Sequence, residues 1–226
     1  MQIPTCYHEF VRQINVNDSK THASWTHWKD RLKTNTYLLP KVEEVEKALG
    51  EEFTRSDVVA FYQKPKIAPE TKFIASMIWG HESEVQANRD GRGPWKLEQT
   101  FQESATAESA IRSCVVTGKD EISYSYSLLK RTLKRCGPNF FTKHFYFLGK
   151  AAELKKFPLP LIFDNRVAQG LARVTGQNST LLKMISVAPK LDASSYLSYL
   201  TFSYGQAELI GCEPDQVEVF LFSFER

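Results

Sequence analysis

The chain has 226 residues, of which 42% are hydrophobic and 24% are charged, and its net charge is +3. These fractions argue against global disorder, and the length suits one domain spanning 1–226. No apolar run is long enough to span a bilayer, and the N-terminus lacks the pattern of a signal peptide. The four cysteines form no CxxC pair, so we expect a cytoplasmic protein with no metal site and no cofactor.

The first half of the sequence predicts helices over 39–49, 58–62, 71–79 and 97–116, and Ser56-Asp57 is predicted to cap the second of them. Between 82 and 96, turn-forming glycine and proline predict a long irregular connection. Its basic residues Arg89, Arg92 and Lys96 are candidate phosphate contacts, and an ordinary surface loop explains them equally well.

The second half predicts helices over 123–135, 165–174, 192–210 and 214–222. The last segment also fits a strand, because Val217, Val219 and Leu221 alternate with other residues. Strands do not alternate with helices anywhere along the chain, so the sequence predicts an all-α fold.

Positive charge is concentrated between 130 and 156, where a single acid, Glu153, accompanies many lysines and arginines. Such a concentration favours contact with a polyanion, although a solvated helix face is the commoner reason for a charge run taken alone. The basic residues are Lys130, Arg131, Lys134, Arg135, Lys143, Lys150, Lys155 and Lys156.

Within this segment, residues 135–139 form a predicted corner between two helices. We expect Gly137 to adopt a left-handed conformation and Pro138 to begin the next helix. Backbone N–H groups at such a corner bind anions, and phosphate contacts of this kind hold DNA without reading its sequence. The candidate DNA-binding residues are Lys134, Arg135, Gly137, Pro138, Asn139 and Phe140.

Lys143 and Asp164 are the candidate catalytic residues. Aromatic residues surround Lys143 in the sequence, and burial favours the neutral amine, which is a nucleophile. Asp164 follows the apolar run 159–163 and is predicted to cap the helix over 165–174. A fixed carboxylate stabilises the positive charge that develops on a sugar when its glycosidic bond breaks.

The segments GPNFFTKHFYF and PLIFDNRV resemble the hairpin lysine and the helix-capping aspartate of the helix–hairpin–helix DNA glycosylases. The resemblance covers about 128–174 and is strongest to the bacterial and archaeal 8-oxoguanine DNA glycosylase-like group. It implies two helical lobes flanking a DNA-binding cleft, with Lys143 as the Schiff-base lysine and Asp164 as the catalytic aspartate. The hairpin departs from the family in having only Gly137 at its turn, and the cluster-binding cysteines of some relatives are absent.

The resemblance implies a monomeric enzyme that flips a modified base out of double-stranded DNA and cleaves its N-glycosidic bond. Attack by the Lys143 amine adds an AP-lyase step, whereas attack by water gives a free base and an abasic site. Two substrates stay open: an oxidised purine such as 8-oxoguanine, and a bulky modified base of phage DNA removed in antiviral defence. The alternative function is a non-catalytic helical module that binds distorted or abasic DNA.

The base pocket is predicted from aromatic and polar residues outside the hairpin segment. Core packing is the alternative role for Trp79 and Phe202. The candidates are Trp79, His81, Phe202, Tyr204 and Gln206.

Overall fold

The computed structural model describes residues 2–17, 20–82, 92–154, 159–175 and 192–224. The helices before the hairpin are η1 (Thr5–Tyr7), α1 (His8–Gln13), α2 (Trp25–Leu32), α3 (Leu39–Leu49), α4 (Arg55–Gln63), α5 (Pro69–Glu82), α6 (Arg92–Thr100), α7 (Ser104–Arg112) and α8 (Lys119–Thr132). The helices after it are α9 (Pro138–Ala151), α10 (Asn165–Val174), α12 (Ala193–Ile210) and α13 (Pro214–Ser223). The only sheet in the described parts pairs two short antiparallel strands, β1 (Thr21–His22) and β2 (Glu52–Phe53).

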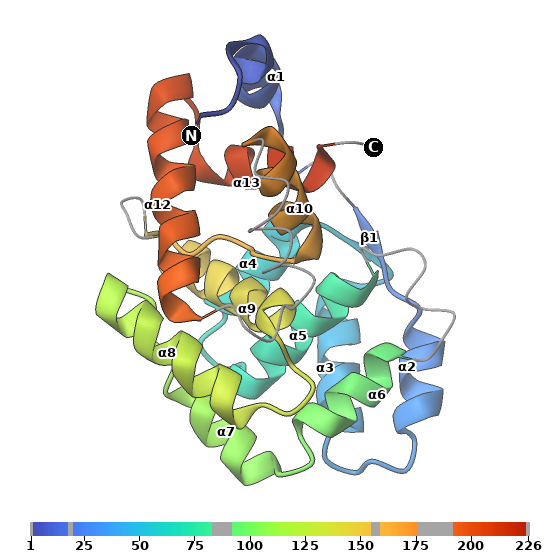
Figure 1. Ribbon diagram of the computed structural model, residues 1–226. Helices are drawn as coiled ribbons and strands as arrows, with labels where there is room; N and C mark the ends of the chain where they lie inside the picture. The colour runs from blue at the N-terminus through green and yellow to red at the C-terminus, as the bar shows by residue number, and fades with distance from the viewer. Residues whose placement is uncertain (1, 18–19, 83–91, 155–158, 176–191, 225–226) are drawn as a thin grey trace.

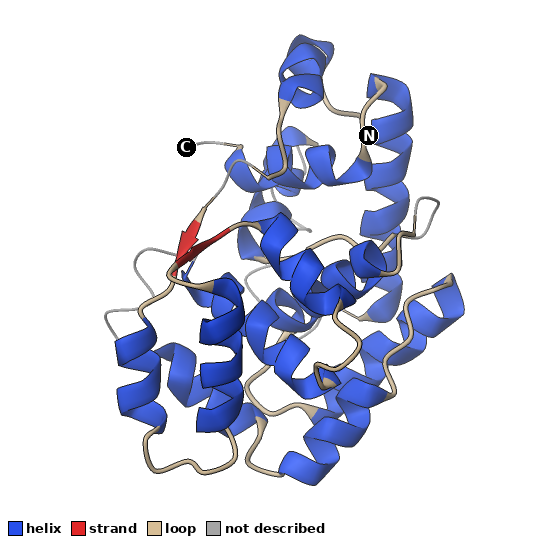
Figure 2. Cartoon of the chain, turned by 180° about the vertical axis from the view of Figure 1, so that it is seen from behind, coloured by secondary structure: helices blue, strands red, loops and turns tan. Residues whose placement is uncertain are grey.

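The predicted all-α class is confirmed, and the helices gather in two groups. Helices α1, α10 and α13 lie at one end of the molecule, and α2, α3, α6 and α7 lie at the other (Figure 1). Helices α5 and α9 pass between these groups, and the view from behind shows the same arrangement (Figure 2). None of the described helices is both long enough and apolar enough to cross a bilayer.

Several predicted helix ends are confirmed by their capping geometry. Helix α3 ends before Gly50, whose φ of 73° requires the left-handed region that glycine tolerates. Asp192 caps α12 by accepting a hydrogen bond from the backbone of Ser195, and Gly211 ends that helix with a φ of 77°. The ambiguous segment after Glu213 is helical, because a capping box with Gln216 starts α13.

Two predictions about local structure are wrong. Helix α4 is capped by Thr54, which forms a capping box with Asp57, so Ser56 already lies inside the helix. The predicted helix over 97–116 is divided into α6 and α7. Thr100 accounts for the division, because its hydroxyl donates to the carbonyls of Lys96 and Lys134 and so ties the end of α6 to the hairpin.

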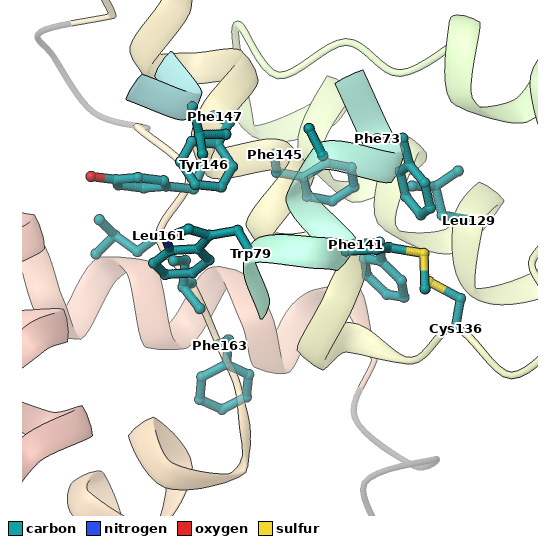
Figure 3. Packing of buried hydrophobic residues seen from close by; sticks show 14 of the residues in the cluster. Phe73, Trp79, Leu129, Cys136, Phe141, Phe145, Tyr146, Phe147, Leu161 and Phe163 are labelled. Carbon is teal, nitrogen blue, oxygen red and sulfur yellow. The ribbon is translucent and has the colours of Figure 1, made fainter. Parts of the chain in front are cut away.

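Helix α9 is the centre of the core. Phe141, Phe145 and Phe147 are fully buried, and the helix packs against α4, α5 and α8 (Figure 3). Burial of three such rings contributes several kcal/mol, roughly 1.5–3 kcal/mol each. The helix that carries Lys143 therefore lies in the interior of the protein. The alternative of a solvated helix face does not hold for Lys143.

Helix α10, which begins after Asp164, is held by unusually close contact with α13. A Cβ atom added to Gly170 would lie 1.9 Å from the backbone oxygen of Leu221. Only a residue without a side chain allows the two helices to approach so closely. This contact fixes the position of the helix whose N-terminus carries the aspartate.

Candidate active site

Lys143 and Asp164 meet in the interior of the protein. The Lys143 Nζ lies 3.2 Å from Asp164 Oδ2, and only 3% of Lys143 and 5% of Asp164 is exposed. The same Nζ donates a hydrogen bond of 2.7 Å to the carbonyl oxygen of Asn139, one turn earlier on α9. A buried ammonium and carboxylate need such partners to offset the loss of hydration.

The two oxygens of Asp164 make different contacts. Oδ1 accepts hydrogen bonds of 3.1 Å from the backbone N–H groups of Arg166 and Val167, as an N-cap does, while Oδ2 faces Lys143. The predicted capping role is therefore confirmed. Because backbone donors and the helix dipole hold the carboxylate, its second oxygen is presented in a fixed direction.

The extended segment before Asp164 is positioned by α9 and α12. Thr142 Oγ1 accepts from the backbone N–H of Phe163, and the hydroxyls of Tyr196 and Tyr199 donate to the carbonyls of Leu161 and Ile162. Sequence reasoning missed these two tyrosines. Their spacing of three along a helix indicates a shared face, but nothing local indicates which segment that face contacts.

Gly80 lies against the catalytic candidate Lys143, and the space that a side chain at this position would take is filled by the lysine. A Cβ atom at Gly80 would lie 2.7 Å from Lys143 Cδ and 2.9 Å from Cε. The glycine on α5 therefore provides room for the lysine to reach Asp164.

Phe140 separates Lys143 from a second lysine. The Nζ atoms of Lys96 and Lys143 lie 4.8 Å and 6.0 Å from the centre of its ring, and the His81 ring stacks on it at 4.5 Å. Burial, together with the positive charges of Lys96 and Lys143, lowers the pKa of His81 to about 3. The imidazole is therefore neutral at physiological pH.

The hairpin turns at a residue other than the predicted one. Gly137 is extended, with φ −86° and ψ −178°, and Arg135 adopts the left-handed region with φ 55°. Pro138 begins α9 as expected. Beside this turn lies a surface hollow of about 470 Å³, lined by Lys96, Lys130, Leu133, Arg135, Cys136, Gly137, Pro138, Asn139 and Phe140.

Most of the residues predicted to contact DNA line this hollow, and one does not. Arg135, Pro138, Asn139 and Phe140 line it, whereas the Lys134 ammonium lies 2.6 Å from the Glu103 carboxylate and does not. Among the other candidate phosphate contacts, Arg92 begins α6 and Lys96 lines the hollow, and Arg89 lies outside the described residues.

The predicted base pocket is brought together only in part. Trp79 is buried, and its ring meets that of Phe147 edge to face (Figure 3). Its Nε1 has no hydrogen-bond partner among the residues that the structure describes. Trp79 and His81 flank Gly80 in the sequence, and the charge of Lys143 acts on His81.

The three candidates on α12 lie elsewhere, which corrects their assignment to this pocket. Gln206 accepts a hydrogen bond from the backbone of Ile3, and Phe202 lines a surface depression with it. Tyr204 accepts from the backbone of Leu159 and lines another depression. Gln206 lies about two turns further along α12 than Tyr199, which packs on Phe163.

An all-α fold in which a buried lysine after a helical hairpin contacts a helix-capping aspartate is the arrangement that the resemblance to the helix–hairpin–helix DNA glycosylases predicts. The family model described as "Putative 8-oxoguanine DNA glycosylase OGG-like protein" matches residues 14–222, and the chain therefore belongs to this DNA glycosylase family. Comparisons with curated proteins and with solved structures give no match.

Proposed function

We propose that the protein binds double-stranded DNA, flips a modified nucleotide out of the stack and cleaves its N-glycosidic bond. The observation that carries this proposal is the contact between Lys143 Nζ and Asp164 Oδ2 in a buried setting. The chain of 226 residues acts as one unit and as a monomer, because its site is built from α5, α9, α10 and α12 of the same chain.

Asp164 stabilises the sugar as the bond breaks. When the C1′–N bond lengthens, its electron pair leaves with the base and positive charge develops on the sugar ring. The Asp164 carboxylate is held by the N-terminus of α10, so it needs little reorganisation to stabilise this charge. The departing base takes up a proton.

Two nucleophiles fit the site and give different products. If the Lys143 amine attacks C1′, its nitrogen loses a proton to Asp164 Oδ2, the carboxylate oxygen that it contacts. A Schiff base then forms and leads to strand cleavage. If water attacks, Lys143 orients the carboxylate, and the products are a free base and an abasic strand. Trapping with borohydride separates the two routes.

The hairpin hollow is the proposed grip on the DNA backbone. It contains the basic side chains of Lys96, Lys130 and Arg135, and none of the described residues that line it is acidic. Phe140 forms part of the hollow and also lies beside Lys143, so a phosphate held there is close to the catalytic pair. Because binding releases counterions, we expect affinity to fall steeply with salt and to depend little on flanking sequence.

The proposed substrate is an oxidised purine, since the family's description names 8-oxoguanine. The test is mass spectrometry of bases released from oxidised DNA and from phage DNA with bulky modified bases. Release of 8-oxoguanine supports the proposal, and release of only the bulky base assigns the enzyme to antiviral defence. Lys143→Ala and Asp164→Asn serve as controls. If no base is released and both variants bind DNA like the parent, the protein is a non-catalytic binding module.

A further inference from the structure

Trp95 differs from every other tryptophan in the chain. Its side chain is 45% exposed, whereas Trp25, Trp28 and Trp79 are all at most 5% exposed. It lies in the first turn of α6, on the surface next to the hairpin. A single exposed aromatic ring is common on proteins, so the surroundings of Trp95 decide whether it has a function.

Arg135 joins Trp95 to the hairpin. Its guanidinium carbon lies 5.8 Å from the centre of the indole ring, and the same side chain lines the hairpin hollow. Arg135 also has a φ of 55°, a conformation that disfavours residues other than glycine. Backbone strain of this kind lowers the stability of the fold and is found mostly at binding and active sites.

Charge around this pair favours nucleic acid as the partner. Lys96 follows Trp95 on α6, and Lys130 lies at the end of α8 across the hollow. An exposed aromatic ring beside several cations is the combination with which proteins bind unpaired nucleotides. The ring stacks on a base while the cations contact phosphates.

We propose that Trp95 stacks on an unpaired nucleobase of the DNA substrate while Arg135 contacts the adjacent phosphate. The inference deepens the proposed function and rests on it, because flipping a nucleotide leaves its partner base unpaired. Phe140 lines the hollow and lies within 6.0 Å of Lys143 Nζ, so an unpaired base at the rim of the hollow is near the position of the flipped nucleotide.

The test uses the full chain and a short duplex in which a tetrahydrofuran abasic analogue lies opposite cytosine. This analogue has no glycosidic bond to cleave and no base to enter the site, so it cannot quench the buried Trp79. We expect this duplex to quench tryptophan emission and a fully paired duplex to quench it much less. Trp95→Phe abolishes the quenching and keeps most of the affinity.

Fluorescence anisotropy of labelled duplexes gives the affinity. Trp95→Ala is expected to weaken binding of the abasic duplex by about 5-fold to 100-fold, and binding of the paired duplex by less. Phe10→Ala is the matched control, because Phe10 is 57% exposed and belongs to α1 at the opposite end of the molecule (Figure 1). This variant binds both duplexes like the parent.

Three results overturn the inference. If anisotropy shows that the abasic duplex is bound but tryptophan emission does not change, Trp95 is not part of the DNA interface. If the paired and abasic duplexes quench the emission equally, Trp95 does not stack on an unpaired base. Binding of neither duplex overturns the proposed function as well, whereas the first two results leave that function intact.

Discussion

Two buried ion pairs in the described part of the chain are built differently. Arg55 and Glu218 form a fork of two hydrogen bonds, 2.8 Å and 3.1 Å long, and the guanidinium lies between the rings of Trp79 and Tyr146. Lys143 contacts Asp164 through one atom pair at 3.2 Å. Burial opposes the charge on Arg55, but the Glu218 carboxylate and Tyr146 together outweigh burial and raise the pKa of Arg55.

This difference is the one expected between a structural ion pair and the proposed reactive pair of Lys143 and Asp164. Both oxygens of Glu218 are used by one rigid, planar partner, and such a pair has one geometry. Asp164 uses one oxygen to cap α10 and turns the other toward a flexible lysine. Loss of the first pair is therefore expected to lower stability, and alteration of the second to lower activity.

Glu218→Gln is the change with the largest expected effect. It leaves the Arg55 guanidinium buried without a countercharge, so we expect the free energy of unfolding to fall by about 3–5 kcal/mol. Urea denaturation measures this, and Glu46→Gln is the control. The Lys29–Glu46 pair is partly exposed, with 37% and 30% of the side chains accessible, so its loss costs under about 1 kcal/mol. Equal losses would contradict the structural role.

Asp164→Asn is expected to have its main effect on activity. Asparagine caps a helix about as well as aspartate, but the buried Lys143 ammonium loses its countercharge, so the free energy of unfolding should also fall, by up to about 3–5 kcal/mol. The charge that stabilises the sugar is lost, so single-turnover base release should slow by about 10²–10³-fold. A variant that is unstable but fully active would show that Asp164 only holds the fold.

Gly80→Ala tests whether the space beside the reactive pair matters. The added Cβ displaces the Lys143 side chain, and a misplacement of about 1 Å can lower the rate by about 10²-fold. Stability should change little, since the displaced atoms are flexible and alanine favours helix. Gly205→Ala in α12 is the control, because nothing lies within 4 Å of its Cβ. Wild-type activity in Gly80→Ala would refute the positioning role.

The smallest expected effect is on the pH dependence of stability. His81 has a pKa of about 3 when folded, against about 6.5 in an unfolded chain. Below pH 6.5 the unfolded state binds a proton that the folded state does not, so stability is lost as pH falls toward 3. Between pH 6.5 and 5 this amounts to about 2 kcal/mol. Urea denaturation of His81→Phe should show a weaker loss, and an unchanged slope would contradict the cause.

The sequence predicts those parts of the molecule that depend on neighbours in the chain. Gly50 and Gly211 mark helix ends, and Asp164 and Asp192 mark helix starts, through backbone hydrogen bonds within a few residues. The chemistry expected of Lys143 is also local, since its aromatic surroundings lie on the same helix.

What the sequence does not predict depends on contacts between distant segments. Arg55 pairs with Glu218 across 163 positions, and Gly80 accommodates a lysine from another helix. Thr100 divides a continuous helical pattern because it also bonds to the hairpin. Spacing along a helix identifies a face but not its partner, so the sequence does not indicate which residues of α12 contact the segment before Asp164.

The most direct test of the central claim is single-turnover base release by Lys143→Ala, Asp164→Asn and the double variant. If the two side chains act together on one sugar, the double variant should lose about as much activity as the worse single variant. Losses that multiply, or a wild-type rate in either single variant, would contradict the account.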